Sequence, residues 1–205
     1  MKTILLITVS IFFILNSQGQ ITKGNWLVGG NMTFSNTKSI STTSLGVGSY
    51  TSINLGISPN IGYFLLDKFA LGLKPSFTHQ KFFGGEVINN GVAVASYGVS
   101  NMDWFDIGPF VRYYFLPVEK NINIFSEINY KYGIANLHPG KGDRNSYSIY
   151  VGPVVYFNSS VGIEFSVGYN SSRETLYGLN SSTDDVSLKN KRIEMGIGLQ
   201  IHLEK

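Results

Sequence analysis

The sequence predicts an eight-stranded antiparallel β-barrel that crosses a membrane, with its strands running up and down in chain order. Three observations predict it. Apolar residues alternate with polar or small residues over eight segments, the connections between these segments alternate between short and long, and the 205 residues include 23 glycines, 14 phenylalanines and 12 tyrosines but only 14% charged residues. A period of two is that of a strand with two different faces, and this composition favours strands over helices.

The N-terminal segment has the pattern of a secretory signal peptide. A positive start precedes an apolar core at residues 4–15, and Ser17 and Gly19 are the small residues that a signal peptidase reads. A core of this length is too short for a helix that crosses the roughly 30 Å hydrocarbon layer. We therefore expect cleavage after Gly19, with residues 1–19 as signal peptide and residues 20–205 as one barrel domain.

Eight segments alternate clearly enough to assign their two faces. In the last of them Ile193 and Ile197 share a face with other apolar residues, while Arg192 and Glu194 lie on the opposite face. A helix with its 3.6-residue period does not produce this pattern. The predicted strands are residues 26–34, 53–63, 69–77, 105–115, 122–132, 147–157, 161–170 and 192–203.

The connections alternate in length as regularly as the strands follow one another. The predicted tight turns are residues 66–68, 117–121 and 158–160, and the predicted long loops, rich in Ser, Thr, Asn and Gly, are residues 36–50, 80–102, 135–145 and 171–190. In membrane barrels of this kind the short turns face the periplasm and the long loops face outward.

A soluble lipocalin-like barrel or a β-sandwich would show the same alternation with its faces reversed. Three features favour the membrane barrel. One face is almost uniformly apolar over all eight segments, the charged residues share the other face with many glycines, and aromatic residues gather near the strand ends. The sequence therefore predicts an apolar outer face and a polar lumen.

The predicted lumen carries equal numbers of positive and negative side chains. They are Lys74, Asp106, Arg112, Glu127, Lys131, Glu164, Arg192 and Glu194. An eight-stranded barrel has an interior just wide enough for side chains, and an unpaired buried charge is costly. We expect a closed, salt-bridged lumen in which the turn at 117–121 sets Arg112 opposite Glu127. The alternative is a polar pore lined by the same residues.

The sequence predicts no catalytic, cofactor or metal site. His79, His138 and His202 have no partner at the spacing of metal ligands. Residues 140–144 lack the spacing of a phosphate-binding loop, so we expect an exposed turn there. The absence of cysteine excludes disulfides, thiolate metal sites and a lipoprotein anchor. The sequence also has no basic run of the kind that binds nucleic acid, so we expect no nucleic-acid partner.

The leader, residues 59–72, residues 108–115 and the alternating last strand together resemble the small outer-membrane β-barrel proteins, which include OmpX and the membrane domain of OmpA. The resemblance implies a place in the outer membrane of a Gram-negative bacterium. It also implies contact with membrane lipid and lipopolysaccharide, with the barrel-insertion machinery and with periplasmic chaperones. Many such proteins end in an aromatic residue, whereas this sequence ends Leu203-Glu204-Lys205.

The resemblance, together with a filled lumen, favours a non-enzymatic protein whose barrel presents four surface loops. Such loops would serve membrane integrity, adhesion or another surface interaction, because loops on rigid scaffolds commonly carry function. The alternative is a narrow diffusion pore or a lipid-modifying enzyme. Enzymes of the latter kind use a histidine with a serine and a carboxylate near the outer rim, a place that His79 or His138 could occupy.

Overall fold

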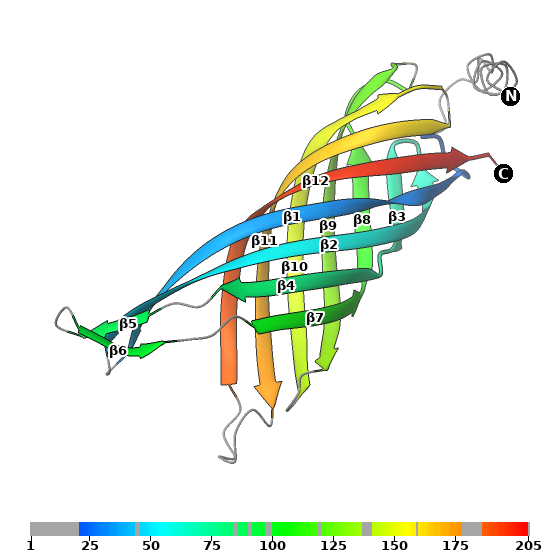
Figure 1. Cartoon of the computed structure of the whole chain (residues 1–205). Coiled ribbons are helices and arrows are strands. Elements are labelled where there is room, and N and C mark those ends of the chain that lie inside the picture. Colours follow the sequence, from blue (N-terminus) through cyan, green and yellow to red (C-terminus); the bar gives the residue numbers. More distant parts are fainter. Residues whose placement is uncertain are drawn as a thin grey trace, which may run out of the picture.

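The structure is a computed structural model. It describes residues 21–43, 46–83, 86–89, 92–96, 100–118, 120–136, 141–158, 160–177 and 186–204. These residues form a barrel of long antiparallel strands (Figure 1). The predicted signal peptide, residues 1–19, lies outside the described residues. Within the described part of the chain no helix is long and apolar enough to span a membrane.

All of the regular secondary structure in the described residues is β-strand. The strands are β1 (Trp26–Thr43), β2 (Gly46–Leu66), β3 (Phe69–Leu73), β4 (Ser76–Phe83), β5 (Glu86–Asn89), β6 (Val92–Ser96), β7 (Ser100–Ile107), β8 (Pro109–Tyr114), β9 (Ile122–Asn136), β10 (Lys141–Tyr156), β11 (Val161–Tyr177) and β12 (Val186–Leu203).

These strands make a closed ring of eight. β3 and β4 are two parts of the third barrel strand, interrupted at Lys74 and Pro75, and β7 and β8 are two parts of the fourth, interrupted at Gly108. β5 and β6 form a hairpin outside the ring that pairs with β2. Because β1 pairs with both β2 and β12, the ring closes, and the predicted eight-stranded up-and-down barrel is confirmed.

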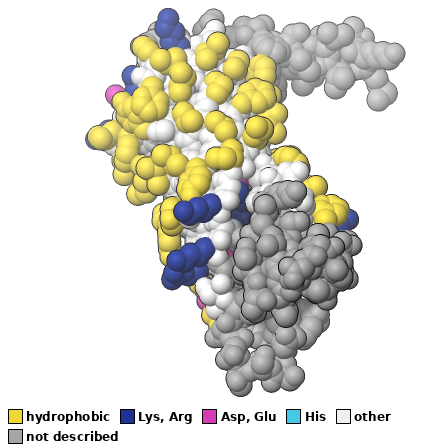
Figure 2. Space-filling view, turned by 90° about the vertical axis from the view of Figure 1, so that its left-hand side faces the viewer, with side chains coloured by type: hydrophobic (Ala, Val, Ile, Leu, Met, Phe, Trp, Pro, Cys, Tyr) yellow, Lys and Arg dark blue, Asp and Glu magenta, His cyan; other side chains and the backbone are white. Residues whose placement is uncertain are grey.

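The two faces of the barrel are those that the alternation predicts. On β12 the side chains of Ile193 and Met195 are 61% and 65% exposed, whereas Gln200 and His202, which face the lumen, are 0% and 1% exposed. Figure 2 shows the hydrophobic side chains gathered over one broad region of the outer surface. The register of each strand follows, because a shift by one residue would turn its whole apolar set into the lumen.

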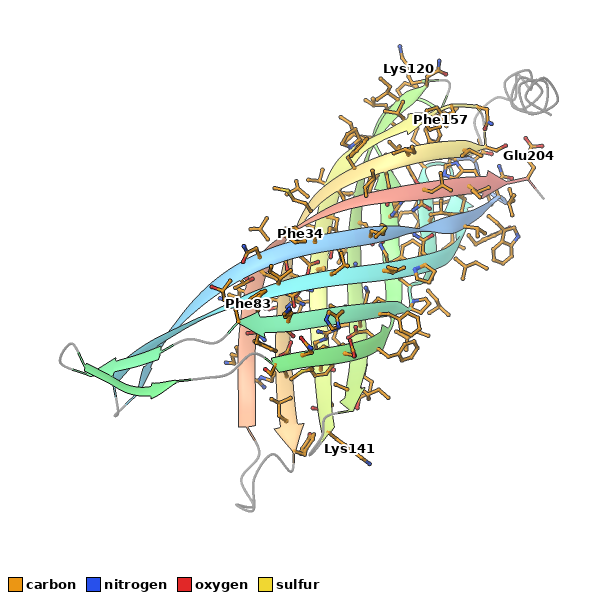
Figure 3. The ribbon with its side chains drawn as sticks, viewed as in Figure 1. Phe34, Phe83, Lys120, Lys141, Phe157 and Glu204 are labelled. Carbon is orange, nitrogen blue, oxygen red and sulfur yellow. The ribbon has the colours of Figure 1, made fainter. Side chains whose placement is uncertain are left out.

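The strands extend beyond the segments that the sequence predicts. Much of the predicted loop sequence is therefore strand, and the structure corrects the prediction at residues 36–43, 46–50, 80–83, 86–89, 92–96, 100–102, 135–136, 141–145, 171–177 and 186–190. Past the apolar band the outer face also carries polar side chains, such as Asn145, Arg173 and Lys189, so the alternation fades although the backbone ladder continues. We call the end of the barrel beyond the apolar band, where the predicted long loops lie, the loop end. The turn end carries the tight turns, and Figure 3 shows Lys120 there and Lys141 at the loop end.

Toward the loop end the ring separates into two sheets. Pairing between β1 and β12 stops at Phe34 and Met195, and β7 pairs with β9 only from Trp104 to Ile107. Beyond these points β1, β2, β4 and β7 form one sheet and β9 to β12 form the other, as Figure 1 shows. Within the described residues, the part of β12 from Val186 to Glu194 therefore has a strand partner on one edge only.

A charge placed on the apolar band should damage the barrel in a way that depends on depth. Ile197→Arg should lower the free energy of unfolding in lipid by about 2 to 4 kcal/mol, since an arginine on the lipid face is most costly at the bilayer midplane. Ser187→Arg is the matched control, because Ser187 is also exposed on β12 but lies near the loop end. Urea unfolding in vesicles measures both variants, and equal losses would mean that the apolar band is misplaced.

Candidate functional site

A continuous chain of ionic contacts crosses the lumen. The Arg112 guanidinium donates to Glu127 Oε2 from Nη2 at 2.6 Å and from Nε at 3.0 Å, and its Nη1 donates to Glu164 Oε2 at 2.6 Å. Lys74 Nζ donates to Glu127 Oε1 at 2.5 Å. These four residues, which we call the charge layer, come from four barrel strands or their junctions. The layer therefore ties opposite walls of the barrel together.

Strand register brings the charge layer together. The pairing of β8 with β9 sets Arg112 directly opposite Glu127, the register expected from the tight turn between these strands. Glu164 reaches the same depth from β11, on the far side of the ring. Asn129 donates a further hydrogen bond to Glu127 at 3.2 Å, and the Arg112 guanidinium stacks 4.4 Å from the centroid of the Phe125 ring. Each charge is thus held by several contacts, which buried ions require.

The other predicted lumen charges lie nearer the loop end. Arg192 Nε donates to Glu194 Oε1 at 2.8 Å, and Glu194 also accepts from the Tyr150 hydroxyl. Lys131 Nζ donates to Ser76 Oγ at 3.1 Å, and Ser76 in turn donates to Asp106. The eight predicted side chains thus all face the lumen. Lys131 is half-buried, and the other seven are 9% exposed or less.

Sequence reasoning missed two members of this network, Arg144 and Glu174. Arg144 donates to Asp106 from Nε at 2.9 Å and from Nη2 at 2.5 Å, and its Nη1 lies 3.7 Å from Glu174 Oε1. The expectation of an exposed turn at residues 140–144 is therefore wrong for Lys141 to Arg144, which belong to β10; Gly140 lies outside the described residues. The missed signal is that the inward face of β10 continues through Gly142 and Arg144.

A compact apolar layer fills the lumen at the turn end, below the charge layer. Its buried members are Ile21, Leu27, Phe64, Ala70, Phe110, Tyr114, Phe125 and Val154. Ile21 reaches it because the segment before β1 folds over the mouth, with the Lys68 amide donating to the Ile21 carbonyl at 2.7 Å and the Gly24 amide donating to the Phe64 carbonyl at 2.9 Å. The N-terminal segment thus closes this end of the barrel.

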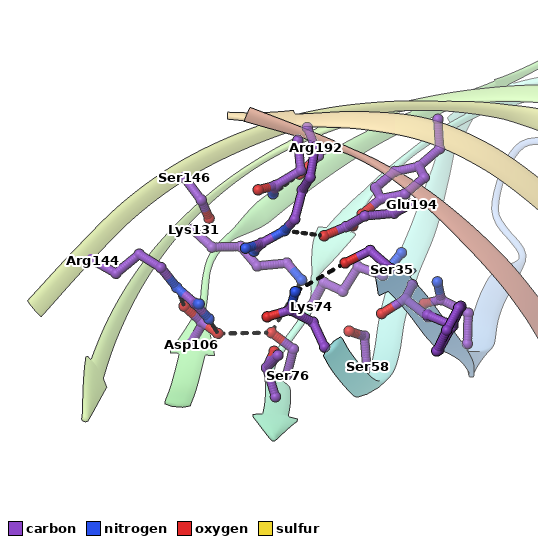
Figure 4. A pocket seen from close by; sticks show the side chains of 18 residues that line it. Ser35, Ser58, Lys74, Ser76, Asp106, Lys131, Arg144, Ser146, Arg192 and Glu194 are labelled. Carbon is purple, nitrogen blue, oxygen red and sulfur yellow. Dashed lines mark hydrogen bonds and ion pairs between the residues drawn. The ribbon is translucent and has the colours of Figure 1, made fainter. Parts of the chain in front are cut away.

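A small polar cavity lies on the loop side of the charge layer (Figure 4). Its volume is about 30 Å³, and its lining includes Lys74, Lys131, Arg144 and Glu194. Since one water needs roughly 10 to 15 Å³ of such space, the cavity has room for about two to three water molecules. Trp104, Ala135 and Leu176 form a second apolar cluster nearer the loop end. The Trp104 ring also stacks against Arg144, 4.4 Å from the guanidinium carbon.

This closed ring with a side-chain-filled lumen is similar to a solved structure. The crystal structure of the outer membrane protein OprG from Pseudomonas aeruginosa superposes with a TM-score of 0.62 at 12% identity, covering 90% of this chain and 98% of that one. The chain has the fold of an outer-membrane β-barrel. At this identity the likeness concerns the fold.

Two further barrels show weaker similarity. The N-terminal β-barrel domain of Pseudomonas aeruginosa OprF gives a TM-score of 0.43 at 15% identity, covering 88% of this chain and 98% of that one. Neisserial surface protein A gives 0.41 at 12% identity, covering 87% and 99%. No protein-family model and no curated protein sequence matches the chain. The assignment of the fold therefore rests on the ring itself and on the comparison with OprG.

The histidines take three different positions. His79 is exposed on β4, where its Nδ1 lies 2.7 Å from Asp103 Oδ1. His202 is buried in the lumen, where it makes edge contacts with the Phe64, Tyr114 and Tyr156 rings. His138 lies outside the described residues. In the part of the chain that the structure describes, no group of three or more His, Asp or Glu residues could hold a metal ion.

Removing Arg112 and Glu127 together should destabilise the barrel less than the two single removals added together. Arg112→Ala or Glu127→Ala alone should cost on the order of 3 to 5 kcal/mol, because each leaves a buried charge with fewer partners. The double variant should cost less than the sum of the two.

Urea unfolding in lipid measures this double-mutant cycle. Ile122→Ala combined with Arg112→Ala is the control, since Ile122 is exposed on the lipid face at the turn end of β9 and should give additive losses. Additive losses for Arg112 and Glu127 themselves would show that the contact between them makes no energetic contribution.

Proposed function

We propose that this protein is a non-enzymatic integral outer-membrane β-barrel whose closed, salt-bridged lumen makes it a rigid anchor for surface hairpins. The hairpins extend β1–β2, β9–β10 and β11–β12 past the apolar band, with β5–β6 added beside β2. Their role would be membrane integrity, adhesion or another interaction at the cell surface. A rigid scaffold with variable projections is the usual arrangement for such a role.

The observation that carries the proposal is the charge layer above the apolar layer. Arg112, Glu127 and Glu164 are each 1% exposed, and Phe64 and Tyr114 next to them are fully buried. Ions passing through the barrel would have to displace both layers. Adding Arg144 and Glu174 to the predicted set keeps positive and negative lumen charges equal in number, so the described lumen needs no external counter-ion.

The same proposal assigns the orientation and the partners. The turn end would face the periplasm and the loop end the cell exterior, as the lengths of the connections indicate. Residues 1–19 would be removed as a signal peptide during export. Membrane lipid and lipopolysaccharide would surround the apolar band, after periplasmic chaperones and the insertion machinery had delivered the chain. A surface ligand would meet the hairpins.

The polar cavity favours one competing function, a narrow diffusion pore. Its lining belongs to the lumen and includes several charged side chains. The two functions differ in what closes the barrel below the cavity, because a pore requires that the charge layer and the apolar layer admit water.

Single-channel recording in planar bilayers separates the two functions. The protein should show no stable conductance of fixed size. A variant in which all four charge-layer residues are serine should conduct more often, because it removes the layer without leaving an unpaired charge. Stable channels of uniform size from the unaltered protein would contradict the closed lumen and favour the pore.

A further inference from the structure

Three cations cluster on the outer face of the barrel near the loop end. Arg173 on β11 and Lys189 and Lys191 on β12 are all exposed. Arg173 is the direct cross-strand partner of Lys189, and Lys191 pairs with Ser171, one outward position nearer the turn end. Direct and diagonal neighbours on one face of a sheet lie about 5 and 7 to 8 Å apart. All three cations are therefore within reach of one phosphate-sized anion.

Such a cluster is unfavourable unless an anion neutralises it. Like charges directly opposite each other destabilise a strand pair. Within the described residues no carboxylate lies within ion-pair distance of Arg173, Lys189 or Lys191. Asp143, diagonal to Arg173 on β10, instead accepts a hydrogen bond from the Tyr177 hydroxyl at 3.1 Å. The described surface thus presents a concentrated positive charge that favours an external anion.

The cation cluster borders the apolar band directly. Next to Lys191 and Ser171, toward the turn end, Ile193 pairs with Tyr169, and Met195 and Ile197 follow on the same face. All four side chains are exposed to the surroundings of the barrel. Figure 2 likewise shows Lys and Arg side chains next to the hydrophobic region. This order, cations above an apolar surface, matches an amphiphile with an anionic headgroup and acyl chains.

Two other features fit a lipid at this place. Beyond Phe34 and Met195 the edge of β12 has no described strand partner, so β1 makes no backbone pairs beside Lys191. On the opposite sheet the exposed His79 of β4 lies against Asp103 of β7, so this basic side chain has a carboxylate beside it, unlike Arg173, Lys189 and Lys191.

We propose that Arg173, Lys189 and Lys191 bind the phosphate of an anionic lipid in the leaflet at the loop end, and that its acyl chains lie along the apolar face of β11 and β12. The inference rests on the proposed membrane location of the barrel and is independent of the closed lumen. The cations supply charge-assisted hydrogen bonds to the phosphate oxygens, and Ile193 and Met195 contact the chains.

Native mass spectrometry of the full folded protein in detergent tests the site. The probe is phosphatidic acid, compared with phosphatidylcholine of the same chains. Replacing Arg173, Lys189 and Lys191 by glutamine should weaken binding of phosphatidic acid about a hundredfold, since each cation near an anionic lipid surface contributes about fivefold. The single variant Lys189→Gln, with an expected loss of about fivefold, serves if the triple variant folds poorly.

The matched control replaces Lys23, Lys81 and Lys120 by glutamine, which removes the same charge elsewhere on the surface and should leave binding unchanged. Two results would overturn the site: unaltered binding of phosphatidic acid to the triple and single variants, or binding of inorganic phosphate as tight as that of phosphatidic acid. Failure of the unaltered protein to insert into lipid vesicles would instead contradict the proposed function.

Discussion

The contact on which the rest of the barrel depends is that of the Arg112 guanidinium with Glu127 and Glu164. It joins β8, β9 and β11 across the lumen at N–O distances of 2.6 to 3.4 Å. A buried arginine is tolerable only with such partners, so its presence fixes which face of each strand points inward. A shift of one residue in β8 would place this cation against lipid. The contact therefore constrains the register of these strands, the face that each turns to the lumen and the closure of the ring.

The charge layer also separates two regions with different chemistry. Below it, Phe64, Tyr114 and the returning N-terminal segment around Ile21 exclude water. Above it, the lumen carries most of its polar side chains, and Arg144 links Asp106 with Glu174. The Asp106–Arg144 contact lies where β7 still pairs with β9, opposite Gly133, and Glu174 is the direct cross-strand partner of Arg144 on β11. The network thus reinforces the β7–β9 junction just before the ring divides into two sheets.

Alternation and turn length were sufficient to predict the ring, the facing of its strands and the pairing of Arg112 with Glu127, because lipid and lumen impose opposite chemistry on alternate residues. They could not predict how far the strands extend, since beyond the lipid the outer face of a strand also carries polar side chains. Arg144 and Glu174 were missed for that reason. Ile21 was missed because its burial comes from a non-repeating segment held by two backbone hydrogen bonds. The division of the loop end into two sheets depends on where backbone pairing between neighbouring strands stops. The residue types along the strands do not specify that point.

The most direct measurement of the closed lumen is a set of nitrogen–carbon distances in the barrel reconstituted in lipid. Solid-state NMR with labelled arginine and glutamate can detect dipolar contacts between the Arg112 guanidinium nitrogens and carboxyl carbons. The account predicts short contacts to both Glu127 and Glu164, with little exchange of the guanidinium protons with water. A guanidinium that exchanges rapidly and contacts neither carboxylate would contradict it, because the lumen at that depth would then be hydrated.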